Sequence, residues 1–191
     1  MTRLVLASAS PRRAALLREA GWAFEVAPVD LDETLRPGET AQAYVERLAQ
    51  AKAAAAASKD PEAVVLGADT TVVVQGQVLG KPLDSADAAR MLRLLSGRTH
   101  DVLTGICLRK GLRSLVHVES SRVRIAALSD AEIEWYIGTG EPFDKAGGYA
   151  VQGLASRFIE AVDGSYSNVV GLPVASVNSL LKQLGCDILK I

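Results

Sequence analysis

The chain has 191 residues, of which 49% are hydrophobic and only 5% aromatic, and its formal net charge at pH 7 is −1. A chain of this length buries about 70% of the surface that its unfolded form exposes, so an aliphatic core needs no disulfide or structural metal. The near-zero charge argues against a general polyanion binder such as a nucleic-acid coat protein, and any anion site must be a local cluster of cations.

Cysteine usage and hydropathy bear on where the protein works. Cys107 and Cys186 have no CxxC or other metal-like spacing, so we expect both to be reduced. The first residues lack the apolar core of a signal peptide, and no apolar run approaches the roughly 18 residues that a membrane span needs. The sequence predicts a cytoplasmic protein that binds neither membranes nor nucleic acids.

The first motif follows a short apolar run, residues 4–7, and reads Ser8-Ala9-Ser10-Pro11-Arg12-Arg13. Pro suits the first position of a helix and Ser suits its N-cap, so a strand is predicted to lead into a helix over residues 11–20. The N-terminus of such a helix attracts phosphate, and arginines bind it in bidentate fashion. The alternative for each arginine is a solvated position at the helix start.

The next segment combines an acidic loop, a helix and a buried strand. Residues 30–40 contain Asp30, Asp32 and Glu33, and Thr40 can cap a helix that runs to about Ser58. An apolar run over residues 63–68 predicts a buried strand that ends at Asp69 and Thr70. A second β-rich run then predicts a hairpin with its turn at residues 75–77.

Helices and strands continue to alternate, which indicates an α/β fold, and the hairpins indicate a mixed rather than a parallel sheet. The Ser129-x-x-Glu132 spacing is that of a capping box, so a helix should start there and stop at Gly138. The other predicted elements are a helix over 85–95, a hairpin of strands 99–108 and 112–125, a loop over 141–148, strands 149–152 and 158–162, a turn over 163–168, and a last helix from Pro173.

Several charged and polar residues could carry chemistry. Asp69, placed at a strand end, can hold a divalent cation or orient a water, although an aspartate there can also simply make a turn. Glu33 could complete a metal site with Asp69, against the alternative of a solvated acid. Lys52 and Lys81 could each bind phosphate or be ordinary surface charges. The amide of Gln152 could pair with a pyrimidine edge or merely end a strand.

Other chemistries are excluded by missing motifs. The chain has no GxxxxGK[ST] P-loop and no GxGxxG after a strand. Its two histidines, His100 and His117, fit the alternation of a hairpin, and neither cysteine neighbours a base. Metal-assisted attack of water on a phosphate-bearing ligand is the chemistry that remains.

The motifs taken together resemble those of the Maf-family nucleoside triphosphate pyrophosphatases. They occur in family order over nearly the whole chain: residues 8–13, Leu66-Gly67-Ala68-Asp69-Thr70 with Gly80-Lys81-Pro82, residues 95–100, and residues 144–153 with 164–173. The resemblance implies a single domain over residues 1–191 with two lobes around a central cleft. It implies an inosine-triphosphatase-like fold, in which helices flank a mixed, partly forked β-sheet.

The resemblance also implies hydrolysis between the α- and β-phosphates, a divalent metal (Mg²⁺ or Mn²⁺) and a homodimer. Asp69 matches the general base, and Arg12, Thr70 and Gln152 match residues linked to base selectivity. Metal ligation is then expected at Asp69 and Glu33. The expected substrate-binding residues are Ser8, Ser10, Arg12, Arg13, Lys52, Thr70, Lys81 and Gln152. Arg12 is expected to touch the substrate, whereas Arg13 could be structural.

Residues 144–149, Gln152 and residues 164–167 resemble the branch that cleaves dTTP and UTP, and possibly modified pyrimidine triphosphates, to clean nucleotide pools. A glutamine can complement both N3–H and O4 of uracil or thymine, which agrees with that branch. Two alternatives stay open. One is a nucleotide-binding regulator of cell division or septum formation without turnover, and the other is the same reaction on modified purine triphosphates.

Overall fold

The structure, a computed structural model, describes residues 3–186 and groups them into two compact units. Unit 1 holds residues 3–70, 104–119 and 171–186, and unit 2 holds residues 71–103 and 120–170. The expectation of a single two-lobed domain stays a prediction. Within residues 3–186, no helix is both long and apolar enough to span a membrane.

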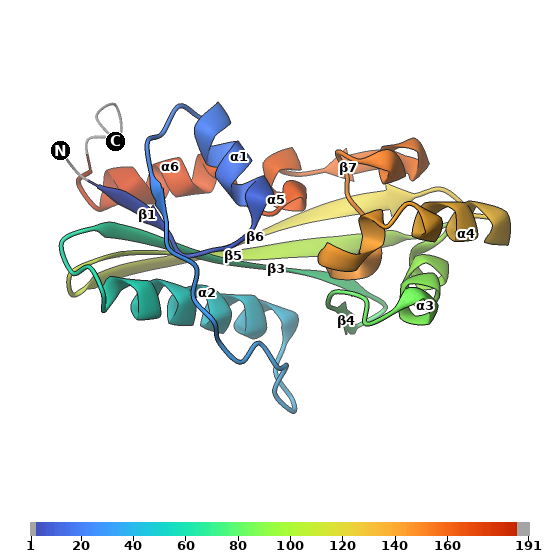
Figure 1. Cartoon of the computed structure of the whole chain (residues 1–191), viewed down its shortest axis with the longest axis horizontal. Helices are drawn as coiled ribbons and strands as arrows, with labels where there is room; N and C mark the ends of the chain where they lie inside the picture. The colour runs from blue at the N-terminus through green and yellow to red at the C-terminus, as the bar shows by residue number, and fades with distance from the viewer. Residues whose placement is uncertain (1–2, 187–191) are drawn as a thin grey trace. The chain divides into compact units, whose positions relative to one another are not determined.

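The strands form a mixed sheet, as predicted (Figure 1). Strand order within the described residues is β2-β1-β3-β5-β6-β7, and β4 pairs with β3. The β1 strand runs parallel to β2 and β3, whereas the β3–β4 and β6–β7 pairs are antiparallel. The strands are β1 (Leu4–Leu6), β2 (Glu25–Val26), β3 (Val64–Val74), β4 (Gln77–Leu79), β5 (Thr99–Lys110), β6 (Arg113–Ile125) and β7 (Ile159–Asp163).

The helices begin at the caps that the sequence indicates. Ser10, Thr40 and Ser129 each accept a hydrogen bond from the backbone N–H three residues later, and Ser129 with Glu132 forms the predicted capping box. The helices are α1 (Pro11–Glu19), α2 (Ala41–Ala57), α3 (Ser85–Leu95), α4 (Asp130–Gly138), α5 (Tyr166–Val170) and α6 (Val174–Gln183), with short 3₁₀ helices η1 (Glu141–Asp144), η2 (Ala146–Gly148) and η3 (Leu154–Phe158).

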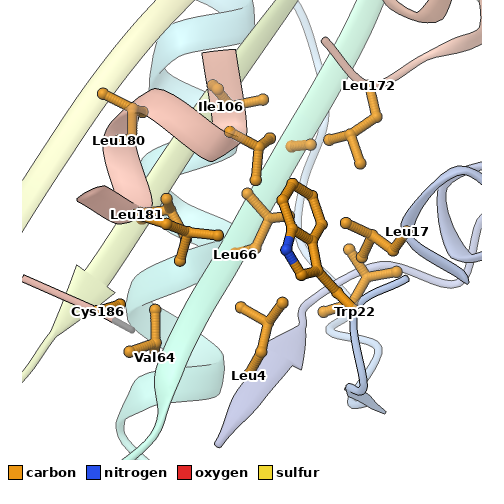
Figure 2. Packing of buried hydrophobic residues seen from close by; sticks show 14 of the residues in the cluster. Leu4, Leu17, Trp22, Val64, Leu66, Ile106, Leu172, Leu180, Leu181 and Cys186 are labelled. Carbon is orange, nitrogen blue, oxygen red and sulfur yellow. The ribbon is translucent and has the colours of Figure 1, made fainter. Parts of the chain in front are cut away.

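Unit 1 has a hydrophobic cluster on each face of its part of the sheet. Helices α1 and α6 cover one face and α2 covers the other (Figure 1). Strand alternation separates the two clusters, since Leu4 and Leu6 belong to the α1/α6 cluster and Val5 to the α2 cluster. The Trp22 indole packs among aliphatic side chains of the first cluster, beside Leu66 (Figure 2).

Helix α2 lies unusually close to the sheet because glycines face it. A Cβ built on Gly67 of β3 would lie 2.2 Å from the Ala49 carbonyl oxygen and 2.6 Å from the Ala53 nitrogen. A Cβ on Gly105 of β5 would lie 2.4 Å from the Val45 carbonyl oxygen. The backbone of α2 therefore rests on strand backbone, and larger residues at these positions would force the helix away.

Unit 2 has its own core, formed by aliphatic and aromatic residues that include members of strands β3 to β6, helices α3 and α4, and η3. Met91, Leu92 and Leu95 of α3 pack in the same cluster as Ile133 and Tyr136 of α4. The predicted β3–β4 hairpin is present, with a turn at Gln75 and Gly76. Both turn residues have positive φ, 51° and 77°, as a two-residue turn that matches the strand twist requires.

Four predictions of secondary structure are wrong. The loop predicted over residues 141–148 contains η1 and η2. Residues 64–74 form one strand, so Asp69 and Thr70 lie inside β3 and not after a strand; threonine and valine favour continued extension there. Residues 149–152 form no strand. The predicted turn over residues 163–168 includes the start of α5.

We expect Gly67→Ala to destabilise the protein, because its methyl group would overlap the Ala49 and Ala53 backbone. Such overpacking costs about 1–3 kcal/mol of unfolding free energy. Chemical denaturation measures this, with Gly138→Ala as the matched control. A Cβ on Gly138, the last residue of α4, meets no atom within 4 Å. Equal stability of Gly67→Ala and wild type would contradict the close packing of α2.

Candidate active site

The centre of the site in unit 1 is a lysine shared by two carboxylates. Lys52 Nζ lies 2.7 Å from Asp69 Oδ1 and 2.6 Å from Glu33 Oε1. Lys52 and Asp69 are buried, and Glu33 is partly exposed. The short distance between α2 and β3 lets Lys52 reach Asp69, since Lys52 precedes Ala53, which contacts Gly67. The two acids predicted as metal ligands therefore meet at one cation.

The loop that carries Glu33 is held by α2. The Tyr44 hydroxyl donates to the Glu33 carbonyl oxygen at 2.9 Å, and Arg47 donates to the Thr34 carbonyl oxygen at 3.1 Å. Arg47 also forms a bidentate pair with Glu39, at 2.6 and 2.8 Å, which lowers the pKa of Glu39 to about 2. Sequence reasoning missed Tyr44 and Arg47; their spacing of three on one helix face was the available signal.

Asp69 is a buried carboxylate whose basicity is increased. Burial raises its pKa, because the charged form loses hydration, although the cations of Lys52 and Arg13 favour that form and oppose the rise. A raised pKa makes the carboxylate a stronger base than an exposed aspartate. It is therefore suited to accept a proton from a water molecule.

Arg13 connects three separate segments of unit 1. Its Nε donates to the Gly171 carbonyl oxygen at 2.8 Å, and its two terminal nitrogens donate to Ser8 Oγ and Thr70 Oγ1, both at 3.0 Å. Thr70 Oγ1 also lies 2.9 Å from Thr104 Oγ1. Burial lowers the pKa of Arg13. These contacts favour the structural interpretation of Arg13 that the sequence left open.

The other predicted residues at this helix start lie in the same unit. Ser10 caps α1 and accepts from the Arg13 backbone N–H at 3.4 Å. Arg12 is half-buried and close enough to Arg13 for their charges to interact. On β3, Asp69 and Thr70 are consecutive and so point to opposite faces, Asp69 toward Lys52 of α2 and Thr70 toward Arg13 of α1.

The chemistry of the donor set fits a divalent cation. Within residues 3–186, no group of three or more His, Cys, Asp or Glu side chains is placed to hold a metal. Mg²⁺ is commonly bound by one or two carboxylates together with substrate phosphates, and Mn²⁺ also favours oxygen ligands. Asp69 and Glu33 supply two carboxylates at one cation position, which the Lys52 ammonium occupies in this structure.

Lys81 and Gln152 belong to unit 2. Both are exposed, and neither side chain forms a hydrogen bond or ion pair with any residue between 3 and 186. Lys81 follows β4, and Gln152 lies in a turn before η3. Each therefore presents its polar end to solvent.

The histidines and cysteines show no arrangement for nucleophilic catalysis. Burial lowers the pKa of His100 to about 4, so this ring is neutral at pH 7, and its Nε2 lies 2.7 Å from the Tyr149 hydroxyl. His117 Nε2 pairs with Glu119 at 3.1 Å. Burial raises the pKa of the Cys107 and Cys186 thiols, which disfavours the reactive thiolate.

Comparison with known proteins identifies one family and several relatives that are similar over nearly their full length. The model described as "Maf-like protein" matches residues 3–184. The dTTP/UTP pyrophosphatase of Anaeromyxobacter dehalogenans is 54% identical over 187 residues, which cover 96% of this chain and 94% of the relative. The dTTP/UTP pyrophosphatase of Koribacter versatilis is 51% identical over 182 residues, with coverages of 95% and 94%.

A solved structure supports the fold. The Staphylococcus aureus Ham1 protein matches with a TM-score of 0.55 and covers 95% of this chain and 99% of its own. The identity is 15%, so this likeness concerns the fold alone. It agrees with the predicted mixed sheet flanked by helices.

We expect Arg13→Ala to destabilise the protein by about 2–4 kcal/mol, because buried acceptors on Ser8, Thr70 and Gly171 lose their donor. Arg13→Lys should recover less than half of this loss, since an ammonium cannot reproduce the planar set of donors. Denaturant unfolding measures both. The exposed Arg18 of α1 is the matched control, and a loss no larger than that of Arg18→Ala would contradict the structural role.

Proposed function

This chain belongs to the family of Maf-like proteins, and from that membership we propose that it hydrolyses dTTP and UTP to the nucleoside monophosphate and pyrophosphate. The observation that carries the proposal is the buried Asp69 carboxylate, which shares Lys52 with Glu33. Relatives that are 54% and 51% identical carry the name dTTP/UTP pyrophosphatase. Removal of triphosphates from the nucleotide pool is the corresponding cellular role.

Asp69 is proposed as the general base. Its carboxylate orients a water molecule and accepts a proton from it as the water oxygen forms a bond to the α-phosphorus. The bond between the α-phosphorus and the oxygen bridging to the β-phosphate breaks, and pyrophosphate leaves with the electron pair of that bond. The raised pKa of Asp69, caused first by burial, favours the proton transfer.

Charge on the triphosphate needs several cationic partners. A divalent cation held by Asp69 and Glu33 would neutralise phosphate charge and polarise the α-phosphate. The Lys52 ammonium, 2.7 Å from Asp69 Oδ1 in this structure, adds a further positive charge beside Asp69. The identity of the cation as Mg²⁺ or Mn²⁺ is part of this proposal.

The start of α1 is proposed to bind phosphate. Arg12 is the proposed donor, and the positive end of the helix dipole adds to its attraction for an anion. Pro11 has no N–H, and the Arg13 N–H already donates to Ser10 Oγ. Arg13, Ser8 and Thr70 keep this loop in place through the hydrogen bonds described above. In unit 2, exposed Lys81 is proposed as a further phosphate ligand.

Base selectivity is assigned to Gln152. Its exposed amide carries both an acceptor and donors, which complement the N3–H and O4 of uracil and thymine. A cytoplasmic location and a homodimer complete the proposal.

Asp69→Asn should lower the rate of pyrophosphate release from dTTP and UTP by about 10²–10³-fold, because the amide cannot accept the proton. The assay is pyrophosphate release with Mg²⁺ or Mn²⁺ present. Asp60→Asn is the matched control; Asp60 precedes β3 and pairs with Arg3. Wild-type turnover by Asp69→Asn would remove Asp69 from this role.

The same assay separates an enzyme from a regulator. Tight binding of dTTP or UTP by the wild type without release of pyrophosphate would favour a nucleotide-binding regulator. Release of pyrophosphate supports the hydrolase.

Gln152→Glu should lower kcat/KM for dTTP and UTP by about tenfold, because a carboxylate loses the donor that meets O4. A panel of natural and modified triphosphates measures this. Gln77→Glu, an exposed change in the β3–β4 hairpin of the same unit, is the control. Unchanged selectivity in Gln152→Glu would point to modified purine triphosphates as the substrates.

A further inference from the structure

The segment that carries Gln152 is held by side chains and not by strand pairing. We call residues 149–155 the Gln152 turn. The Leu154 N–H donates to Glu141 Oε2 at 2.9 Å, and the Ala155 N–H donates to Oε1 at 3.4 Å. The Tyr136 hydroxyl also donates to Glu141 Oε1, at 2.8 Å. One carboxylate therefore anchors the backbone on the C-terminal side of Gln152.

The N-terminal side of the turn has its own anchor. The Tyr149 hydroxyl lies 2.7 Å from His100 Nε2, and the two rings meet edge to face with centroids 5.3 Å apart. Both rings are buried. The backbone is therefore fixed on both sides of Gln152.

The Glu141 carboxylate is suited to this task. Burial by itself raises its pKa, but hydrogen bonds from the Leu154 N–H, the Tyr136 hydroxyl and the Ala155 N–H outweigh burial, so the pKa lies below its ordinary value. The group thus stays an acceptor at neutral pH. Gly153 leaves room for it, since a Cβ there would lie 2.4 Å from Oε1 and 2.5 Å from Oε2 of Glu141.

Gln152 itself has no such support. Its side chain is exposed and makes no hydrogen bond within the described part of the chain. The place of its amide therefore depends on the backbone of the turn. A misplacement of about 1 Å can cost about 10²-fold in rate for groups that position a substrate.

We propose that Glu141, together with Tyr136, is a positioning residue for base selectivity, which holds the Gln152 turn so that the Gln152 amide meets the pyrimidine edge. This inference rests on the proposed hydrolysis of dTTP and UTP. Neither Glu141 nor Tyr136 touches the substrate; both act through the turn.

Glu141→Gln and Gly153→Ala test the proposal from two sides. Glu141→Gln replaces one acceptor oxygen with an N–H₂ group, although the Leu154 and Ala155 N–H groups and the Tyr136 hydroxyl need an acceptor there. In Gly153→Ala, the added methyl group displaces the Glu141 carboxylate, which keeps its charge. We expect each to lower kcat/KM for UTP and dTTP by about tenfold, mainly through KM, since the proposed hydrogen bonds between the neutral Gln152 amide and the base are weakened. The rate on ribose 5-triphosphate, which has no base, should not change.

Glu132→Gln is the matched control. Glu132 also accepts backbone and hydroxyl hydrogen bonds in unit 2, but it does so in the capping box of α4. We expect a loss of stability and no loss of selectivity for UTP over the base-free substrate. Thermal melting of every variant identifies those that remain folded, and Tyr136→Phe provides a milder variant that keeps the ring.

A double-mutant cycle with Gln152→Ala completes the test. If Glu141 acts through Gln152, then Glu141→Gln has no further effect on selectivity once the amide is absent. Additive losses, or unchanged selectivity in folded Glu141→Gln, Gly153→Ala and Tyr136→Phe, would overturn the positioning role while the proposed function stands. If the wild type releases no pyrophosphate from UTP or dTTP, the proposed function fails and this inference fails with it.

Discussion

The contact between α2 and the sheet is the constraint on which the candidate active site depends. Gly67 and Gly105 have no side chain, so the backbone of α2 packs directly against β3 and β5. At this distance the side chain of Lys52 reaches Asp69, and Tyr44, earlier on the same helix, holds the loop that carries Glu33. A larger residue at Gly67 or Gly105 would push α2 away from the sheet. It would thereby separate Lys52 from Asp69 without contacting either side chain.

The charges that this packing brings together are costly to bury. The Lys52 ammonium and the carboxylates of Asp69 and Glu33 together carry a net negative charge. Burial is the largest cause of the raised pKa of Asp69. Buried ion pairs seldom stabilise a fold relative to well-packed apolar residues. An arrangement of this kind is more readily explained by a chemical task, such as proton acceptance and binding of a cation, than by a contribution to stability.

The two units hold their polar side chains in place in different ways. In unit 1, side chains hold other functional groups directly, as Arg13 does when it links Ser8, Thr70 and the Gly171 carbonyl. In unit 2, the exposed amide of Gln152 has no partner within residues 3–186, and Glu141 fixes the backbone around it. The first arrangement holds charged side chains directly, whereas the second leaves the Gln152 amide in solvent and fixes only the backbone that carries it.

The sequence by itself determined the class of fold, the starts of the capped helices and the hairpins, because caps, turns and hydrophobic periodicity act between near neighbours. It did not show that residues 149–152 avoid strand pairing, since the Tyr149 hydroxyl contacts the distant His100 ring and the Ala150 carbonyl accepts from the Gly153 N–H within a turn. Only the tertiary structure decided that Arg13 binds the Gly171 carbonyl, 158 residues away, and that Lys52 joins Glu33 to Asp69. Such contacts depend on how closely helices approach the sheet, which local patterns do not encode.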